Sequence, residues 1–581
     1  MEVKNNIIKV LLISSATLLG LSSCNDSFMD KFPETSISEE MFFRTPKDLE
    51  LYTNGLYGLI GSNTWDVASD NVLYAEESSI YQKMRGEVNP DNAGTWSWGN
   101  IRNVNFMLAR AGHAEGDEAE INHYVGLARM FRAKLYYDKV VSYSDVPWYS
   151  RDLQTTDTEL LFKPQDPRAM VVDSIMADLD FAVNHMKEDM ASSTIWNRFG
   201  ALAMQARIAL SEASWRKYHP ELELTDAERF YRVAIDACQQ IIESGNYALS
   251  TVPLGDIPAY EALFCSEDLS TNKEMIFYED YDKALGRTHN AQAMLDWTTG
   301  LSRDLMEDYL VVEDGVTKRF QDLPGYDKKT FTEIFENRDP RLSQTFMTPG
   351  FTRPGNTKPH RQKISLGGYP QVKYSPRTYD QIGWGLSYAD LPVIRYAEVL
   401  LMYAEAKAEL GELTQEDVDK TINVIRDRVA MPHATLAEWM SNIDPVQANR
   451  YANVSSSQKG AVLEIRRERR IELACEGFRY DDIMRWNAMK LFENPKTYLG
   501  MRVTDKVKAL YQPEVFEGST ARDLIEYNGK TYIRMYSGKS LNEAGRKWTG
   551  NDKRLYYPIP TSQITLSASH GSLLKQNPGW E

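Results

Sequence analysis

Cysteine is scarce in this chain: the 581 residues include only Cys24, Cys238, Cys265 and Cys475. No two of them have the spacing of a zinc knuckle or of a CxxC redox motif. The three in the body of the chain are most simply buried small hydrophobic side chains, because free cysteine is among the most buried residue types. A Cys238–Cys265 disulfide and a free reactive thiol are the alternatives. The eight histidines are scattered, so we expect no metal site and no cofactor.

The motifs of common enzyme classes are also missing. The sequence contains no HExxH, GxSxG or GxGxxG motif, which carry zinc, nucleophilic serine and dinucleotide chemistry. Gly529-Lys530-Thr531 matches the end of a phosphate-binding loop, but position 524 is leucine instead of glycine. With 82 acidic residues, no pair of carboxylates can be singled out as a glycosidase site. We therefore expect a protein that is not an enzyme, with a surface hydrolase as the least favoured alternative.

An excess of positive charge is absent as well, since the formal net charge is -16. An acidic surface repels a phosphate backbone, so no nucleic-acid partner is expected. Residues 466–470 hold four arginines, but acidic residues alternate with them. The pairs Glu464–Arg467 and Arg469–Glu472 are spaced i,i+3, which predicts a helix with ion pairs along it.

Long apolar runs are absent beyond the start of the chain. Lys4 and Lys9 precede an apolar stretch that ends at Leu21 and is too short for a stable membrane span. The sequence LSSC, ending at Cys24, resembles the bacterial lipobox, in which the cysteine thiol receives a diacylglycerol. More than one acyl chain gives stable anchoring. We predict a signal peptide at residues 1–23 and lipidation of Cys24; a plain signal peptide followed by a coincidental cysteine is the alternative.

Helical periodicity dominates the rest of the chain, with apolar residues at i, i+3, i+4 and i+7. Alanines gather where neighbouring helices would meet, which favours stacked helical hairpins of a tetratricopeptide-like array. The periodicity predicts helices over 46–61, 97–112, 119–142, 168–188, 196–217, 226–244, 393–410, 415–429 and 458–489.

Two segments lack this period. Residues 246–392 are rich in glycine, proline and aromatics, and their RPGNTKPH and SLGGYPQ stretches are typical of turns. Residues 495–557 are similar, and IEYNGKTYIRM predicts a β-hairpin with a turn at Asn528-Gly529. We expect both segments to pack on one side of the helical array, and loops of this length are usually functional.

Tryptophan is plentiful, with 12 residues, and several lie in loop sequence. A flat aromatic face supports the apolar face of a sugar ring, while neighbouring amide and guanidinium groups bind its hydroxyls. The alternative for each tryptophan is burial beneath the loops, where tryptophan commonly lies. The candidates in loop sequence, with their polar neighbours, are Trp65, Trp96, Trp98, Asn100, Arg102 and Trp297.

Several late motifs occur together and in a fixed order. They are VIRYAEVLLMYAEAKAELG (393–411), INVIRDRVAM (422–431), RRERRIELACEGFRYDDIMRW (466–486), and YYPIPTSQITL with LLKQNPGW within 556–580. Together they resemble the SusD/RagB family of nutrient-binding outer-membrane lipoproteins of Bacteroidetes. FRTPKDLELYTNGLY, LSRDLMEDY and NRDPRLSQT, which precede them, agree with this resemblance.

The resemblance implies a mainly α fold, with tetratricopeptide-like helix pairs and a loop-rich subdomain with a few short strands. It implies one domain over 24–581, with helical scaffold at about 40–245 and 393–490, excursions at about 246–392 and 495–557, and a C-terminal segment at 556–581. It also implies a lipoprotein facing the cell exterior that captures a glycan, or in some members a peptide. That nutrient passes to a partner SusC-like TonB-dependent transporter, without catalysis. A protein that only covers its transporter is a further alternative.

The resemblance places the ligand site by region. The loop before an early helix holds Trp96, Trp98, Asn100 and Arg102, and the irregular middle holds Tyr281 and Trp297. Motif residues on the late helices are expected to be scaffold: Arg395, Glu398, Glu405, Glu468, Arg470, Glu476 and Arg485.

The lipobox leads to a first prediction. Changing Cys24 to alanine removes the lipid acceptor, so the protein should leave the membrane fraction without unfolding. Cell fractionation and circular dichroism measure the two effects. Continued outer-membrane association of the Cys24→Ala variant, in a strain that lacks the partner transporter, would contradict lipidation at this residue.

Overall fold

The computed structural model describes most of the chain from residue 42 onward. The described residues are 42–66, 69–74, 79–93, 96–188, 192–295, 299–360, 369–505, 524–534 and 552–581. The expected signal peptide (1–23), Cys24 and Trp297 lie outside these ranges, so their roles stay predictions.

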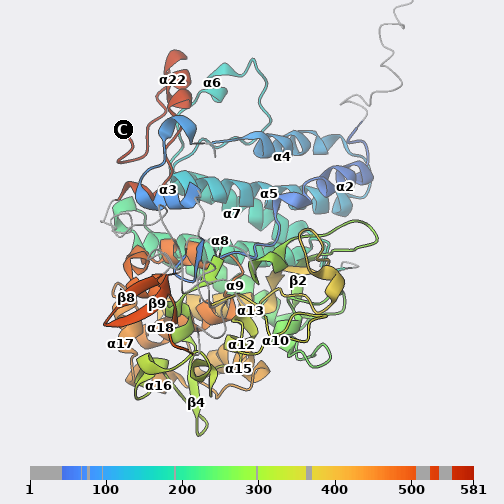
Figure 1. Ribbon diagram of the computed structural model, residues 1–581. Helices are drawn as coiled ribbons and strands as arrows, with labels where there is room; N and C mark the ends of the chain where they lie inside the picture. Colours follow the sequence, from blue (N-terminus) through green and yellow to red (C-terminus); the bar gives the residue numbers. More distant parts are fainter. Residues whose placement is uncertain are drawn as a thin grey trace, which may run out of the picture.

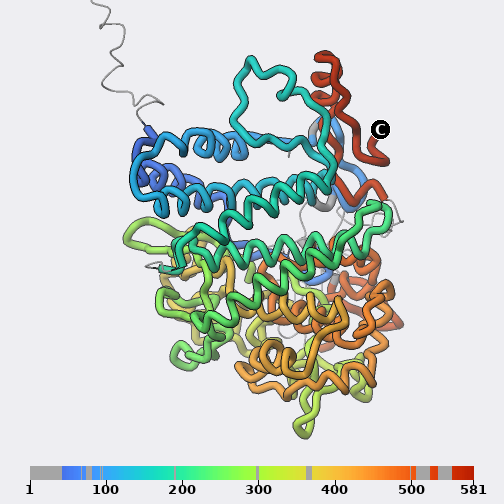
Figure 2. Tube along the Cα trace, turned by 180° about the vertical axis from the view of Figure 1, so that it is seen from behind, coloured from blue at the N-terminus to red at the C-terminus, as the bar shows by residue number. Residues whose placement is uncertain are grey.

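Long helices stacked in layers form the scaffold (Figures 1 and 2). Each packs on the next along the chain: α4 on α5, α5 on α7, α7 on α8, α8 on α9, α9 on α13 and α13 on α18. Such nearest-neighbour packing is typical of a helical-repeat array. The scaffold helices are α2 (Pro46–Asn54), α4 (Gly99–Arg110), α5 (Glu118–Tyr143), α7 (Arg168–His185), α8 (Arg198–Tyr218), α9 (Ala227–Glu243), α13 (Tyr396–Leu410), α14 (Gln415–Val418), α15 (Val424–Arg428), α18 (Lys459–Glu472) and α19 (Arg479–Arg485).

Local signals set the ends of these helices. The Asp117 carboxylate accepts the backbone N–H of Ala119 at the start of α5, at 2.8 Å. Asn197 caps α8 in the same way, accepting from the N–H of Gly200 at 3.0 Å. Gly411 ends α13 in the left-handed region, at φ 78°, where glycine bears no Cβ penalty. The ends of these helices therefore depend on residues close by in the chain.

Three predicted helices are interrupted. Residues 391–395 form strand β6 before α13 begins, and a π-helix at 419–423 separates α14 from α15. The predicted helix 458–489 stops at Glu472 and resumes at Arg479. Between them Gly477 has φ 80°, and a Cβ there would lie 2.3 Å from the Asn63 side chain. The close approach of Asn63 explains why the helix breaks at Gly477, where the apolar periodicity had predicted no break.

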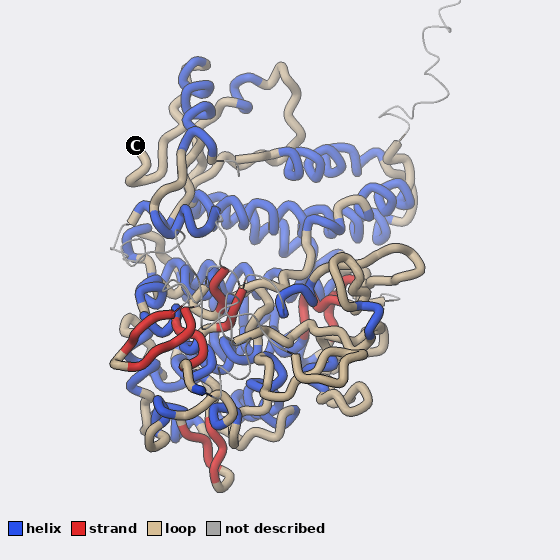
Figure 3. Tube along the Cα trace, in the orientation of Figure 1, coloured by secondary structure: helices blue, strands red, loops and turns tan. Residues whose placement is uncertain are grey.

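The strands are short and form small sheets within the lower half of Figure 3. In one, β8 and β9 form a hairpin with Asn528 at φ 49° and Gly529 at φ 68°, so the predicted turn is confirmed. The mainly α fold with a few short strands is confirmed too. The antiparallel pairs are β1 (Val72–Tyr74) with β3 (Thr299–Leu301), β2 (Met275–Glu279) with β6 (Leu391–Arg395), β4 (Val311–Glu313) with β5 (Val316–Lys318), and β9 (Lys530–Arg534) with both β7 (Leu499–Arg502) and β8 (Leu524–Tyr527).

Shorter helices complete the described chain, and three of them, α10, α11 and α12, lie in the loop-rich middle. Two others, α6 and α22, lie together at one end of the layered array (Figure 1). The shorter helices are α3 (Ser79–Arg85), α6 (Thr158–Leu161), α10 (Ala259–Ala262), α11 (Arg303–Asp308), α12 (Arg341–Thr345), α16 (Leu436–Ser441), α17 (Pro445–Arg450) and α22 (Thr561–Ser569).

The described cysteines are buried and unpaired. Cys238, Cys265 and Cys475 are free and lie in the apolar core, so the prediction of buried small side chains is confirmed and the Cys238–Cys265 disulfide is wrong. Burial raises the pKa of Cys265 to about 12. A thiol with so high a pKa is almost never a thiolate at neutral pH and is therefore inert.

The arginine-rich helix α18 is buried, and its ion pairs mostly join it to other segments. Glu464 and Arg467 pair within the helix at 2.7 Å, as predicted. The predicted Arg469–Glu472 pair is wrong, because Arg469 pairs with Asp482 at 2.8 Å. Glu472, which is fully buried, meets three guanidinium groups from outside α18 instead. They belong to Arg395 (2.6 Å), Arg341 (3.0 Å) and Arg428 (2.5 Å).

The motif residues expected to be scaffold are buried and ion-paired. Glu405 of α13 is representative: it accepts Arg485 of α19 at 2.5 Å and the indole N–H of Trp486 at 2.8 Å. Burial alone would raise the pKa of Glu405, but Arg485 and two further arginines lower it to about 2, against an ordinary value of 4.5. The ionised pair therefore stabilises the fold above pH 4.5, and this contribution is lost as pH falls through about 2.

A stability prediction follows for Glu405→Gln. Removing the Glu405 charge takes from the buried Arg485 one of its two carboxylate partners, the other being Asp482, so the variant should lose up to roughly 3–5 kcal/mol of unfolding free energy at pH 7. The difference from the parent should shrink as pH falls from 4.5 toward 2, because the parent then protonates Glu405. Urea unfolding at several pH values measures this difference. A deficit that stays constant down to pH 2 would contradict the assignment.

Candidate ligand-binding site

Two tryptophans stand next to one another just before α4. Trp98 is the residue preceding the helix, and its ring meets that of Trp96 edge-on at 5.2 Å between centroids. Trp96 also packs edge-on against Tyr143 at 4.8 Å, and Trp98 against Tyr149 at 5.5 Å. Both tryptophans are half-buried, so each keeps part of its ring surface open.

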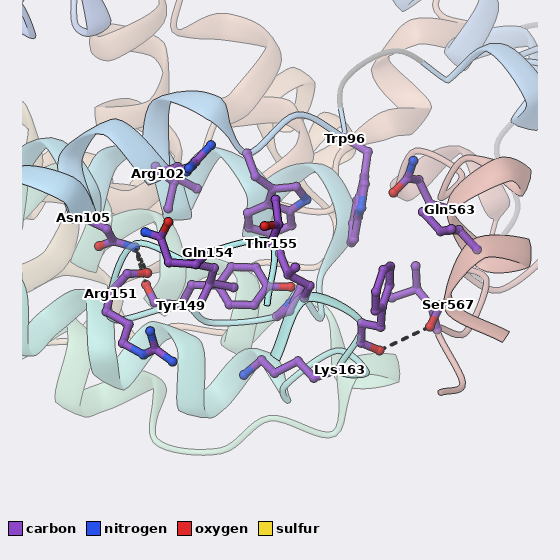
Figure 4. A pocket seen from close by; sticks show the side chains of 18 residues that line it. Trp96, Arg102, Asn105, Tyr149, Arg151, Gln154, Thr155, Lys163, Gln563 and Ser567 are labelled. Carbon is purple, nitrogen blue, oxygen red and sulfur yellow. Dashed lines mark hydrogen bonds between the residues drawn. The ribbon is translucent and has the colours of Figure 1, made fainter. Parts of the chain in front are cut away.

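The open surface of this pair lines a pocket of about 350 Å³ (Figure 4). The first turn of α4 contributes Arg102, and α22 contributes Gln563. The segment between α5 and α7 contributes nine residues, from Pro147 to Lys163. Apolar walls of leucine, proline and phenylalanine alternate with amide and cationic side chains. The pocket therefore combines aromatic surface with hydrogen-bonding groups from three distant parts of the chain.

A buried arginine holds one wall of the pocket in place. Arg132 of α5 donates to Asp178 at 2.7 Å, to the Asn105 amide oxygen at 2.9 Å and to the Ser150 carbonyl at 3.1 Å. Asn105 in turn donates to the carbonyl of Tyr149 at 2.8 Å. A charged group with all these partners is rigid, so the loop that carries Tyr149 is fixed to the helical scaffold.

The opposite wall is held by the C-terminal segment. The side-chain amide of Gln165 donates to the backbone carbonyl of Lys575 at 2.6 Å and accepts from the backbone N–H of Lys575 at 3.0 Å. The rings of Phe162 and His570 stack at 3.7 Å. These contacts place α22 beside α6, which Figure 1 shows, and so bring Gln563 to the pocket.

The structure brings together some of the sequence-predicted site residues. Trp96, Trp98 and Arg102 line the pocket, whereas the exposed Asn100 is not among its lining residues. Trp65 is half-buried in the segment between α2 and β1 and does not line the pocket either. Tyr281 lies in the middle region, where its ring packs edge-on against His289 at 4.5 Å.

Sequence reasoning missed most of this pocket, since only Trp96, Trp98 and Arg102 of its 18 lining residues were predicted. Tyr149, Arg151, Gln154 and Lys163 come from a polar connecting segment, and Gln563 comes from a motif that had indicated only family resemblance. No periodicity or spacing marks a loop residue as facing a tryptophan fifty positions away. The signals that were available, aromatic and amide residues in loop sequence, occur in many places along the chain.

The middle region contains a second hollow, of about 360 Å³. Leu295, Phe351, Pro354 and Trp384 are among the residues that line it, and Trp384 is 66% exposed. Tyr281 does not line this hollow. Trp384 had not been predicted as a site residue, although it also lies in glycine-rich loop sequence.

Clusters of metal ligands and bilayer-spanning helices are both absent from the part of the chain that the structure describes. No group of three or more histidine, cysteine or acidic side chains there is arranged to hold a metal ion. None of the described helices combines the length and apolar content that crossing a bilayer requires.

Comparison with curated proteins reveals relatives along most of the chain. SusD-like protein P2 of Formosa agariphila is 23% identical over 493 residues, covering 81% of this chain and 88% of that protein. SusD-like protein P38 of the same organism is 22% identical over 518 residues, covering 83% and 92%.

Solved structures share the fold. A SusD-like carbohydrate-binding protein of Bacteroides fragilis superposes with a TM-score of 0.66 at 20% identity, covering 90% of this chain and 99% of that one. A laminarin-binding SusD-like protein gives 0.55 at 17% identity, covering 92% and 100%. The profile of the SusD family matches residues 273–580, more than half of the chain. This protein therefore belongs to the SusD family, in agreement with the resemblance of its late motifs.

Proposed function

We propose that this protein is a cell-surface lipoprotein that binds an oligosaccharide and passes it to a partner SusC-like TonB-dependent transporter. The main support for oligosaccharide binding is the pocket at Trp96 and Trp98. Its volume, about 350 Å³, falls within the roughly 300–1,000 Å³ usual for small-molecule sites.

The side chains of the pocket suit a sugar. The half-buried rings of Trp96 and Trp98 offer apolar surface to the C–H face of a pyranose. Gln154 and Gln563 can donate to and accept from hydroxyl groups, and Arg102 can donate. Membership of the SusD family and the laminarin-binding neighbour support a glycan ligand without identifying it.

Peptide binding is the second candidate function. Arg102, Arg151 and Lys163 place three cationic side chains at one pocket, and guanidinium groups bind carboxylates well. However, Arg151 is already paired with Asp157 at 3.0 Å and Lys163 with Asp166. With two of the three cations paired, the glycan proposal is favoured; mass spectrometry of co-purified ligand distinguishes the two.

Delivery to a transporter rests on the family and on the predicted lipid at Cys24. A lipid anchor holds the protein at the membrane surface, where a transporter lies within reach. We further propose that it faces the cell exterior, since that is where an oligosaccharide is encountered. Its role is then capture and transfer.

Alanine substitution of the tryptophans tests the site. Trp96→Ala and Trp98→Ala should each weaken polysaccharide binding at least about tenfold, because each removes a stacking face. Calorimetry against plant, host and microbial polysaccharides measures this. Trp384→Ala, a tryptophan in the second hollow, is the matched control, and Trp297→Ala tests the middle region. Unaltered binding in both pocket variants would refute this site.

The absence of catalysis can be tested directly. No aspartate or glutamate is among the described residues that line the pocket, whereas glycoside hydrolysis ordinarily uses a pair of carboxylates. Incubation with a bound polysaccharide should therefore release no reducing ends. Their steady release, at a rate that falls in the Trp96→Ala variant, would show a hydrolase instead.

A further inference from the structure

The pocket at Trp96 and Trp98 has positively charged walls, although the chain as a whole is strongly acidic. Its lining residues include the cations Arg102, Arg151 and Lys163, whereas the chain has a formal net charge of -16. None of the described residues that line it carries a carboxylate. The pocket therefore offers cations to a ligand and no acidic side chain that would repel an anion.

Arg102 is the cation that no other side chain engages. It lies on the first turn of α4, and its backbone N–H donates to the carbonyl of Trp98 at 2.9 Å. Residues four apart lie on the same side of a helix, and Arg102, labelled in Figure 4, lines the pocket together with Trp98. Within the described chain, the exposed guanidinium of Arg102 forms neither an ion pair nor a hydrogen bond. Its N–H donors are therefore available to a ligand.

The other two cations are held by carboxylates that do not line the pocket. Arg151 pairs with Asp157 at 3.0 Å. Lys163 pairs with Asp166, whose carboxylate also accepts the backbone N–H of Trp148 at 2.7 Å. When these two partners are counted with the three cations, one positive charge at the pocket stays uncompensated, and it is that of Arg102.

Two further features make the surroundings of Trp98 more positive. The first turn of α4 holds no acidic residue, and no described side chain caps its start. The partial positive charge at that end of the helix is therefore not neutralised by a neighbouring carboxylate. In addition, the ammonium of Lys139 lies 5.5 Å from the centroid of the Trp98 ring.

The charge at Arg102 bears on which sugar fits best. A neutral sugar can stack on the indole of Trp98, but it offers the guanidinium only weak acceptors. A sugar with a carboxylate or a sulfate ester stacks equally well and also accepts charge-assisted hydrogen bonds, which are about twice as strong as neutral ones. Gln154 and Gln563 remain available for the hydroxyl groups of either sugar.

We propose, on the basis of the glycan-binding function above, that this pocket selects an acidic glycan. The sugar that stacks on Trp98 carries a carboxylate or a sulfate ester, and this group binds Arg102. The negative charge of the whole chain does not prevent this, because charges more than about 8 Å apart are largely screened at physiological ionic strength. An acidic peptide offers the same carboxylate, but it lacks the apolar C–H face that the two half-buried indoles accommodate.

Calorimetry with paired oligosaccharides tests this selection. The probes are oligogalacturonate and oligomannuronate, each with its carboxyl-reduced counterpart, and sulfated galactan oligosaccharides with their desulfated counterparts. The members of each pair share their linkages and length and differ in the acidic group, so the pairs also distinguish a carboxylate from a sulfate. We expect at least one acidic member to bind at least tenfold more tightly than its neutral counterpart.

The salt dependence of binding provides an independent measurement. Raising the NaCl concentration from about 0.05 to about 0.5 M shortens the range of electrostatic attraction. The affinity for the acidic oligosaccharide should therefore fall at least threefold, and that for a neutral counterpart should change less than twofold. An affinity for the acidic member that does not respond to salt would contradict its binding to a cation.

Variants of Arg102 separate recognition of the acidic group from stacking. Arg102→Gln should weaken binding of the acidic oligosaccharide at least fivefold and that of its neutral counterpart less than twofold. Arg102→Lys keeps the charge and should bind the acidic oligosaccharide within about threefold of the parent. Lys273→Gln is the matched control, since it removes one exposed positive charge outside the pocket, and it should change neither affinity.

The outcomes distinguish failure of this selection from failure of the glycan site. Equal binding of the two members in every pair, or an unchanged preference in Arg102→Gln, would overturn the selection; weaker binding in Trp98→Ala would then still support the glycan site. If no glycan binds, acidic or neutral, both proposals are refuted. Tetraglutamate binding more tightly than every acidic oligosaccharide would show a peptide site and would likewise overturn both.

Discussion

Buried pairing between arginines and carboxylates around α18 is the interaction on which the rest of this structure depends. Glu472, fully buried, compensates guanidinium groups from three segments outside α18, among them Arg395 of β6 and Arg341 of α12. Two residues earlier in α18, Arg470 meets Asp70 at 2.9 Å and Asp304 at 3.0 Å. Ions taken out of water need well-placed partners, so these pairs fix where the loop-rich middle sits on the helical array.

Buried polar contacts also fix the loops that form the binding surface on this scaffold of repeating helices. Such an array has regular faces, and recognition depends on what lies on them. Here Arg132, buried within the array, holds the loop that carries Tyr149, and the C-terminal segment is attached through Gln165. Two loops and a terminal helix thereby surround the tryptophans. Sequence changes in these loops and in the terminal helix can alter which ligand is bound while the helical scaffold stays the same.

Paired and unpaired charges mark different parts of the molecule. Around α18 nearly every ion has a partner, as a permanent structure requires. Lys83 of α3 is buried as well, but among the described residues its ammonium lies over the ring of Tyr557 and contacts no carboxylate. Burial lowers the pKa of Lys83 to about 7 and so favours its neutral form, whereas the paired Glu405 has a pKa lowered to about 2 and stays ionised. The difference comes from the charged partner, which Glu405 has in Arg485.

The sequence by itself determined the helices, their caps, the Asn528-Gly529 turn, and the adjacency of Trp96 and Trp98, because each depends on residues a few positions apart. Only the tertiary structure decided that the helix predicted over 458–489 breaks, since Gly477 must approach Asn63 closely. It also decided which carboxylate each arginine meets, and that Gln563 joins the tryptophans. Those outcomes depend on contacts between segments up to hundreds of residues apart, which no local pattern encodes.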